Sequence, residues 1–175
     1  MTRQCGECQL CCRLLPVRAV HKPASQRCQY QRFGVGCTIY RELHVRSPEC
    51  RLWSCAWLGG SAGDIGRPDR SHIVIDILPD FVTVTETKQT VPAIQVWIDP
   101  NYPEAHRNPA LRAYLQQCGQ ERGECAIIRY SSSDGFVLFP PALTGAGWVE
   151  KHGPFSERTH LMAEVVEAAA KRARS

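Results

Sequence analysis

Periodic hydrophobic patterns appear in the second half of the chain, where they first predict strands. In residues 73–77 every second position is isoleucine, a period of two that is typical of a strand. Pro79-Asp80 is typical of a turn, and residues 81–87 are dense in the β-branched side chains that strands favour. Residues 91–98 repeat that composition. We therefore expect three strands, the second of which returns along the first.

A helix is expected next, because both its start and its buried face are marked. Asn108 can cap a helix, and the proline that follows it suits the first helical position. Leu111, Leu115 and Cys118 then fall on one helical face. Gly119 is a common kind of helix stop, so we expect the helix to end there.

The last part of the chain predicts a hairpin and a second helix. Residues 124–130 and 136–139 are joined by the turn-forming sequence 131–135. A final helix is expected from a cap at Ser156 to about Arg174, with basic residues near its end that complement the helix dipole.

The first part of the chain shows little periodicity, and a glycine-rich stretch follows it. The expected fold class is α+β, with an irregular cysteine-rich module at 1–58, a linker at 59–70 and an α+β domain at 71–175 packed on the module. In that domain short connections favour a small, mainly antiparallel sheet with two helices.

Cysteine content changes this picture, because eight of the ten cysteines fall within the first 55 residues. A buried cysteine behaves as a small hydrophobe that Ala or Val could replace, so packing does not explain this density. A shared chemical partner does, and the candidates are disulfides, zinc and iron bridged by sulfide.

The N-terminus bears on the choice between disulfides and metal. Residues 1–5 lack the apolar segment of a signal peptide, and no stretch of ~18 apolar residues could span a membrane. We therefore expect a reducing cytoplasm, where clustered cysteines are more often metal ligands. Cys11 and Cys12 also suit disulfides poorly, since adjacent cysteines cannot easily bridge each other.

The spacing of the first cysteines indicates a metal site. Cys5, Cys8 and Cys11 follow the pattern C-x2-C-x2-C, which supplies three ligands to a 4Fe–4S cluster with the fourth thiolate from elsewhere. A C-x2-C pair also supplies half of a tetrahedral zinc site, and eight thiolates divide evenly between two zinc ions. Cys12 suits a second site. Both metals stay open, with the run of three favouring iron–sulfur.

Another pair of thiols follows a proline. If Pro48 starts a helix, Cys50 and Cys55 lie roughly one and a half turns apart on it. Trp53, Trp57 and Leu58 would then cover the site.

Charge is divided unevenly along the chain. Residues 1–58 hold nine Lys or Arg against three Asp or Glu, while residues 59–175 hold twelve against fourteen. A basic module invites a nucleic-acid interpretation. The favoured interpretation is that the arginines balance anionic thiolates, because the basic residues form no dense run and no aromatic stacking platform is evident.

The order of these motifs resembles a known family. The sequence C-x2-C-x2-C-C, a lone Cys, Cys37-Thr-Ile-Tyr40, and then Cys50 and Cys55 followed by Trp57-Leu58 is similar to the CxxCxxCC cysteine-cluster family, also called YkgJ-like. The resemblance covers about residues 5–58. It implies a metal-chelating bacterial protein, labelled Fe–S oxidoreductase or zinc-binding, and the same cluster occurs in flagellin lysine methylases. By the family motif the ligand candidates are Cys5, Cys8, Cys11, Cys12, Cys28, Cys37, Cys50 and Cys55.

The remaining reactive residues predict no catalytic site. We interpret Cys118 and Cys125 as core thiols, and Asp76, Glu86 and Asp99 as solvated acids near strand ends. No nucleophile motif marks residues 71–175, so enzymatic activity stays undecided.

Two hypotheses follow from the sequence. The first is a metalloprotein with an iron–sulfur cluster for redox or modification chemistry, which works with an unknown protein or redox partner. The second is a zinc-stabilised module that binds protein or nucleic acid without catalysis.

Overall fold

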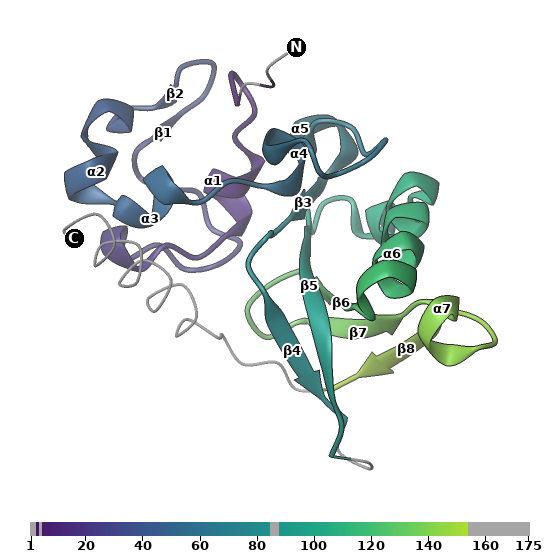
Figure 1. The fold of residues 1–175 in the computed structure, drawn as a ribbon. Coiled ribbons are helices and arrows are strands. Elements are labelled where there is room, and N and C mark those ends of the chain that lie inside the picture. The colour runs from purple at the N-terminus through teal and green to yellow at the C-terminus, as the bar shows by residue number, and fades with distance from the viewer. Residues whose placement is uncertain (1–2, 4, 85–87, 154–175) are drawn as a thin grey trace, which may run out of the picture.

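A computed structural model describes residues 3, 5–84 and 88–153, and Figure 1 shows its arrangement. An N-terminal segment of short helices lies on one side of a twisted sheet, and the long helix α6 lies on the other. The fold is α+β, as expected. The expected final helix at 156–174 lies outside the described residues.

The principal sheet has the strand order β3-β5-β6-β7-β8, and β4 also pairs with β5. All its pairings are antiparallel except that between β5 and β6, which is parallel. Its strands are β3 (Ile73–Ile75), β4 (Asp80–Thr83), β5 (Thr90–Ile98), β6 (Cys125–Arg129), β7 (Gly135–Phe139) and β8 (Val149–His152).

The first two strands differ from the sequence prediction. Strand β4 does not return along β3; both pair with β5, β3 with its C-terminal half and β4 with its N-terminal half. Strand β3 also ends at Ile75 rather than at residue 77, and Ile77 is half exposed. Both β3 and β4 pair with the long strand β5, so the chain at residues 76–79 must bend to lead from one to the other.

Helix α6 (Pro109–Arg122) starts where the sequence predicts and ends later. The Asn108 side chain accepts a hydrogen bond from the backbone N–H of Ala110 at 2.9 Å, as an N-cap does. The expected stop at Gly119 is wrong, because the helix continues and Gly123 (φ 67°) forms its C-cap. Gly119 instead permits close packing, since a Cβ there would lie 2.6 Å from the Pro140 side chain.

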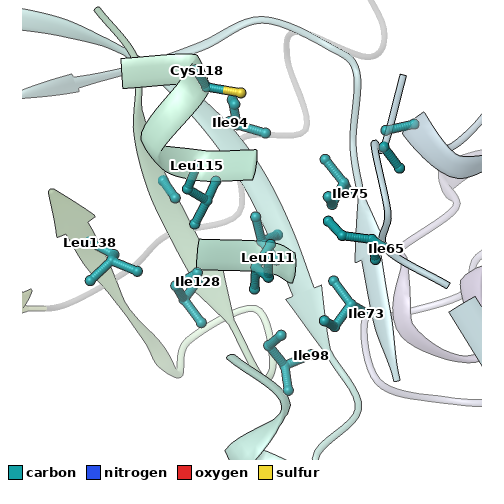
Figure 2. Close-up of a cluster of buried hydrophobic side chains, with 14 of the residues drawn as sticks. Ile65, Ile73, Ile75, Ile94, Ile98, Leu111, Leu115, Cys118, Ile128 and Leu138 are labelled. Carbon is teal, nitrogen blue, oxygen red and sulfur yellow. The ribbon is translucent and has the colours of Figure 1, made fainter. Parts of the chain in front are cut away.

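Helix α6 covers one face of the sheet and builds the main core with it (Figure 2). Leu111, Leu115 and Cys118 face the strands, as their helical spacing predicts. Ala62 and Ile65, from the stretch 59–70, are also buried in this core. The division into module, linker and domain stays a prediction.

The opposite face of the sheet carries the N-terminal segment. Val74 of β3 and Trp97 of β5 pack against Leu10, Leu14 and Cys55 in a second cluster. The same β-strands therefore supply one core to α6 and another to the cysteine-rich segment.

The N-terminal segment is built from short elements. Up to residue 59 they are α1 (Leu10–Leu14), β1 (Gln31–Arg32), β2 (Gly36–Cys37), α2 (Leu43–Arg46), α3 (Pro48–Leu52), α4 (Ala56–Gly59) and single 3₁₀ turns at Arg18–Val20 and Tyr40–Glu42. The short helix α5 (Pro68–Ser71) then leads into β3. Pro48 does start a helix, but it ends at Leu52, so Cys50 and Cys55 do not share it. Three later elements were not predicted from the sequence: η3 (Pro103–Arg107), which precedes α6, and α7 (Pro141–Thr144) and β8, which follow β7.

Candidate functional site

A cavity of about 920 Å³ lies between the N-terminal segment and the sheet. Each of the eight predicted cysteines lines it, although they come from separate loops and helices. The sheet contributes Asp76, Gln95, Trp97 and Arg129 to its other wall. The N-terminal thiols therefore share one space, whereas Cys118 and Cys125 are buried in the cores of the sheet.

Local backbone structure places each thiol. Cys5 and Cys8 belong to a tight turn, in which the N–H of Cys8 donates to the carbonyl of Cys5 at 2.9 Å. Cys11 and Cys12 follow in α1, and the N–H of Cys28 donates to the Cys12 carbonyl at 3.0 Å.

The later cysteines are held by three different elements. Cys37 ends β2, and Cys50 lies in α3. Cys55 caps α4, where its sulfur accepts a hydrogen bond from the N–H of Leu58 at 3.4 Å.

We group Cys5, Cys8, Cys11 and Cys55 as a first set, because Cys5 interacts with each of the other three. A hydrogen bond from the Cys11 side chain lowers the pKa of Cys5 to about 7. Burial raises the pKa of Cys8 to about 11, with a further contribution from the charge of Cys5. Burial also raises the pKa of Cys55, which feels the same charge. Cys5 is thus the centre of this set.

A second set is formed by Cys12, Cys28, Cys37 and Cys50. Burial is the main cause that raises the pKa of Cys37 and of Cys50, and both feel the charges of Cys12 and Cys28. A hydrogen bond from Cys11 lowers the pKa of Cys12, which places the two sets side by side at the start of α1.

A buried lysine lies beside these thiols. The Lys22 side chain is only 6% exposed, and its Nζ donates to the backbone carbonyls of Arg13, Leu15 and Pro23. Burial lowers its pKa, while the charges of nearby thiols, Cys28 and Cys12 foremost, act in the opposite direction. Lys22 therefore places a positive charge against the second set.

Asp76, which lines the cavity, and Asp99, which follows β5, are both buried, and this corrects the expectation that they are solvated. The Oδ1 of Asp76 accepts hydrogen bonds from Trp53 Nε1 and from the Leu78 N–H, both at 2.9 Å. Burial raises the pKa of Asp76. Asp99 is 1% exposed and forms an ion pair with Arg13. Glu86 lies outside the described residues.

The rest of the sheet wall was not identifiable from sequence. The Arg129 guanidinium lies 5.6 Å from the ring centroid of Trp97, and both side chains are buried. Gln95 Nε2 donates to Asp80 Oδ2 at 2.7 Å. Gln95 and Trp97 are two residues apart on β5, and Arg129 of β6 lies opposite Trp97. These three side chains reach the cavity because they share one face of the sheet.

Metal-ligand chemistry is available at this site, but the side chains are not gathered around one point. In the described ranges, no group of three or more His, Cys, Asp and Glu side chains is placed to hold one ion. All ten cysteines are free thiols, and the Cys11 side chain is within reach of both Cys5 and Cys12 for a hydrogen bond to either. The donor set suits soft metal ions, because thiolates are their preferred ligands.

No protein-family model, curated protein or solved structure matches this chain. The resemblance to the cysteine-cluster family therefore stays an expectation drawn from the motif. Within the described part of the chain, no helix has the length and apolarity to cross a membrane.

Proposed function

We propose that this protein binds metal through its eight N-terminal cysteines, as an iron–sulfur cluster or as zinc. One observation carries the proposal: thiols from separate segments line a single cavity, and none is in a disulfide. Structural packing alone gives no reason for eight thiols to meet in this way. The reducing cytoplasm that we expect from the sequence would keep them free.

The two sets of thiols support two metal sites. Cys5, Cys8 and Cys11 would supply the C-x2-C-x2-C ligands of an iron–sulfur cluster, with Cys55 as the fourth. Cys12, Cys28, Cys37 and Cys50 would form a second four-thiolate site. Lys22 and the arginines of the segment would offset the negative charge of these thiolates.

The chemistry supplied would depend on the metal. A bound iron–sulfur cluster would supply one-electron transfer, for which a redox partner is then needed. Such a cluster would also suit a modification-associated role. The chain offers no further group in the described residues to which we assign a catalytic step.

A zinc-stabilised module is the second candidate, and the division into four and four thiols favours it. Closed four-thiolate zinc sites are structural and contribute directly to folding. In that case the N-terminal segment would be a binding module without catalysis.

Metal analysis tests the proposal. Anaerobically purified protein is expected to contain about four iron and four acid-labile sulfide per cluster, with a broad visible absorption band, if the first candidate holds. About two zinc and no sulfide would establish the second candidate. Protein with neither metal, even after reconstitution with iron and sulfide or with zinc, would refute metal binding.

Matched variants test the ligand sets. Cys8→Ser and Cys28→Ser are each expected to remove about half of the bound metal, since each breaks one set. Cys125→Ala is the control, because this buried thiol does not line the cavity and Ala replaces a small hydrophobe. Full metal content in both serine variants would contradict the assignment of ligands.

A further inference from the structure

The N-terminal segment exposes a group of large hydrophobic side chains. Of the nine large hydrophobic residues that are exposed in the described residues, five belong to the stretch 33–52. They are Phe33, Val35, Tyr40, Val45 and Leu52. Contiguous exposed apolar side chains on a protein surface commonly mark an interaction site.

The tip of the β1–β2 hairpin is the most exposed part of this group. Phe33 is 91% exposed and Val35 is 79% exposed, on either side of Gly34, whose φ of 71° allows the turn. The base of the hairpin is anchored: Gln9 Nε2 donates to the Arg32 carbonyl at 2.9 Å, and Gln31 Nε2 donates to Gln9 Oε1 at 2.7 Å. The fold therefore holds two apolar side chains out in solvent.

This surface adjoins the thiol cavity. Val35, Tyr40 and Leu52 belong to the cavity lining while they are also exposed. Cys37 and Cys50 lie within two residues of Val35 and Leu52, respectively. A molecule seated on these side chains would cover the mouth of the cavity.

The same stretch carries an excess of positive charge. Glu42 is paired with Arg46 at 3.2 Å, and the Glu49 carboxylate accepts a hydrogen bond from the backbone N–H of Arg18 at 3.1 Å. Within the described ranges, Arg32, Arg41 and Arg51 are exposed and form no salt bridge. Opposite charge on a partner would complement them and speed its association.

We propose that residues 31–52 form a docking surface for a protein partner that presents apolar side chains among carboxylates. Protein interfaces are enriched in arginine and in aromatic residues, and this stretch exposes both kinds. Nucleic acid fits less well, because three of the five exposed side chains are aliphatic and only Phe33 and Tyr40 offer a ring for base stacking. A second copy of the chain would place arginines against arginines.

Fluorescence anisotropy with a labelled synthetic peptide tests this surface. The probe carries Leu and Phe among Glu residues, and its counterpart carries Lys in place of Glu. We expect the full chain to bind the acidic peptide at least about tenfold more tightly than the basic one. The double variant Phe33→Ser/Val35→Ser is expected to weaken that binding about tenfold or more. Val149→Ser is the control, because Val149 is 39% exposed but lies in β8 and does not line the cavity.

Several outcomes would overturn the proposal. Equal affinity for the two peptides, or unchanged affinity in the double variant, would remove the case for an acidic protein partner. Tighter binding of a single-stranded DNA oligonucleotide would favour nucleic acid. A dimer in light scattering that the double variant dissociates would make a second copy the occupant.

The docking proposal is separable from metal binding. Phe33 and Val35 supply no metal-ligating atom, so metal content in the double variant should equal that of the unchanged chain. Lost peptide binding with full metal content in the double variant supports the surface. Absent metal in both proteins, with peptide binding present in the unchanged chain and weakened in the double variant, would refute only the proposed metal sites.

Discussion

Cys5 and Cys8 are neighbours in one tight turn, yet their surroundings give the two thiols different acidities. Cys5 is exposed and receives a hydrogen bond from Cys11, which lowers its pKa to about 7. Cys8 is buried, which raises its pKa to about 11. At pH 7 about half of the Cys5 thiols, but only about one in ten thousand of the Cys8 thiols, are thiolates.

We therefore expect metal-free protein to be alkylated at Cys5 well before Cys8. Thiolates are the reactive form, so the rate at Cys5 should rise as the pH increases through about 7 and then level off. Timed iodoacetamide labelling with peptide mass spectrometry measures both rates in one sample. Cys125 is the internal control: it is buried, which raises its pKa to about 12, so it should stay unlabelled while the sheet is folded. Equal rates at Cys5 and Cys8 with Cys125 unlabelled would contradict the assignment.

Gly119 shows how one element depends on another. A Cβ at this position would lie 2.6 Å from the Pro140 side chain and 3.1 Å from the Ala142 Cβ, so there is no space for it. We expect Gly119→Ala to lower the free energy of unfolding by about 1–3 kcal/mol through overpacking. This loss should appear even though Ala is favoured over Gly in a helix by about 1 kcal/mol. Urea denaturation measures it.

Gly147→Ala is the matched control for this prediction. Its added Cβ would meet no atom within 4 Å, and its φ is outside the left-handed region. Its stability should stay within about 0.5 kcal/mol of the unchanged chain. A Gly119→Ala variant as stable as this control would show that the helix can shift away from Pro140 at little cost.

The ends of helices and strands could be predicted from the sequence where neighbouring residues determine them. Asn108 and Pro109 start α6 because the cap and the first turn involve only adjacent residues. The end of α6 was not predictable, because Gly119 is required by contact with Pro140, which lies beyond the β6–β7 hairpin in the sequence. Strand β4 was misassigned as a partner of β3 for the same reason, since the edge of β5 decides both pairings.

At the scale of the whole molecule, the glycine-rich stretch 59–70 contributes buried side chains to the main core, although its composition predicts a linker. Ile65 is 3% exposed in the core that α6 and the sheet build. We expect Ile65→Ala to cost about 2–5 kcal/mol of unfolding free energy, as for other buried isoleucines. Thermal and urea denaturation measure the loss.

Asp64→Ala provides the control, because Asp64 is exposed in the same stretch. A near-neutral effect is expected for it, within about 0.5 kcal/mol. If Ile65→Ala were equally neutral, the stretch would be a linker in energetic terms despite its burial.

The sequence predicts the thiols of the candidate site, but it does not predict the other residues that surround them. The cysteine positions follow from the sequence, and the described structure places all eight at one cavity. Lys22, Trp97 and Arg129 carried no signal, because each is an ordinary residue until tertiary packing buries it beside the thiols. The ligand assignment itself stays a prediction.

The cluster that joins Leu10 and Leu14 to Val74 and Trp97 also limits how early the N-terminal segment can complete its packing during synthesis. A ribosome releases the cysteines first and the strands that complete their packing later. Such contacts between distant residues form slowly, because a long loop of chain must close first. Arg13 and Asp99 impose the same delay. The thiols therefore lack their final packing until β5 has been synthesised, so their cavity is completed late in the maturation of the protein.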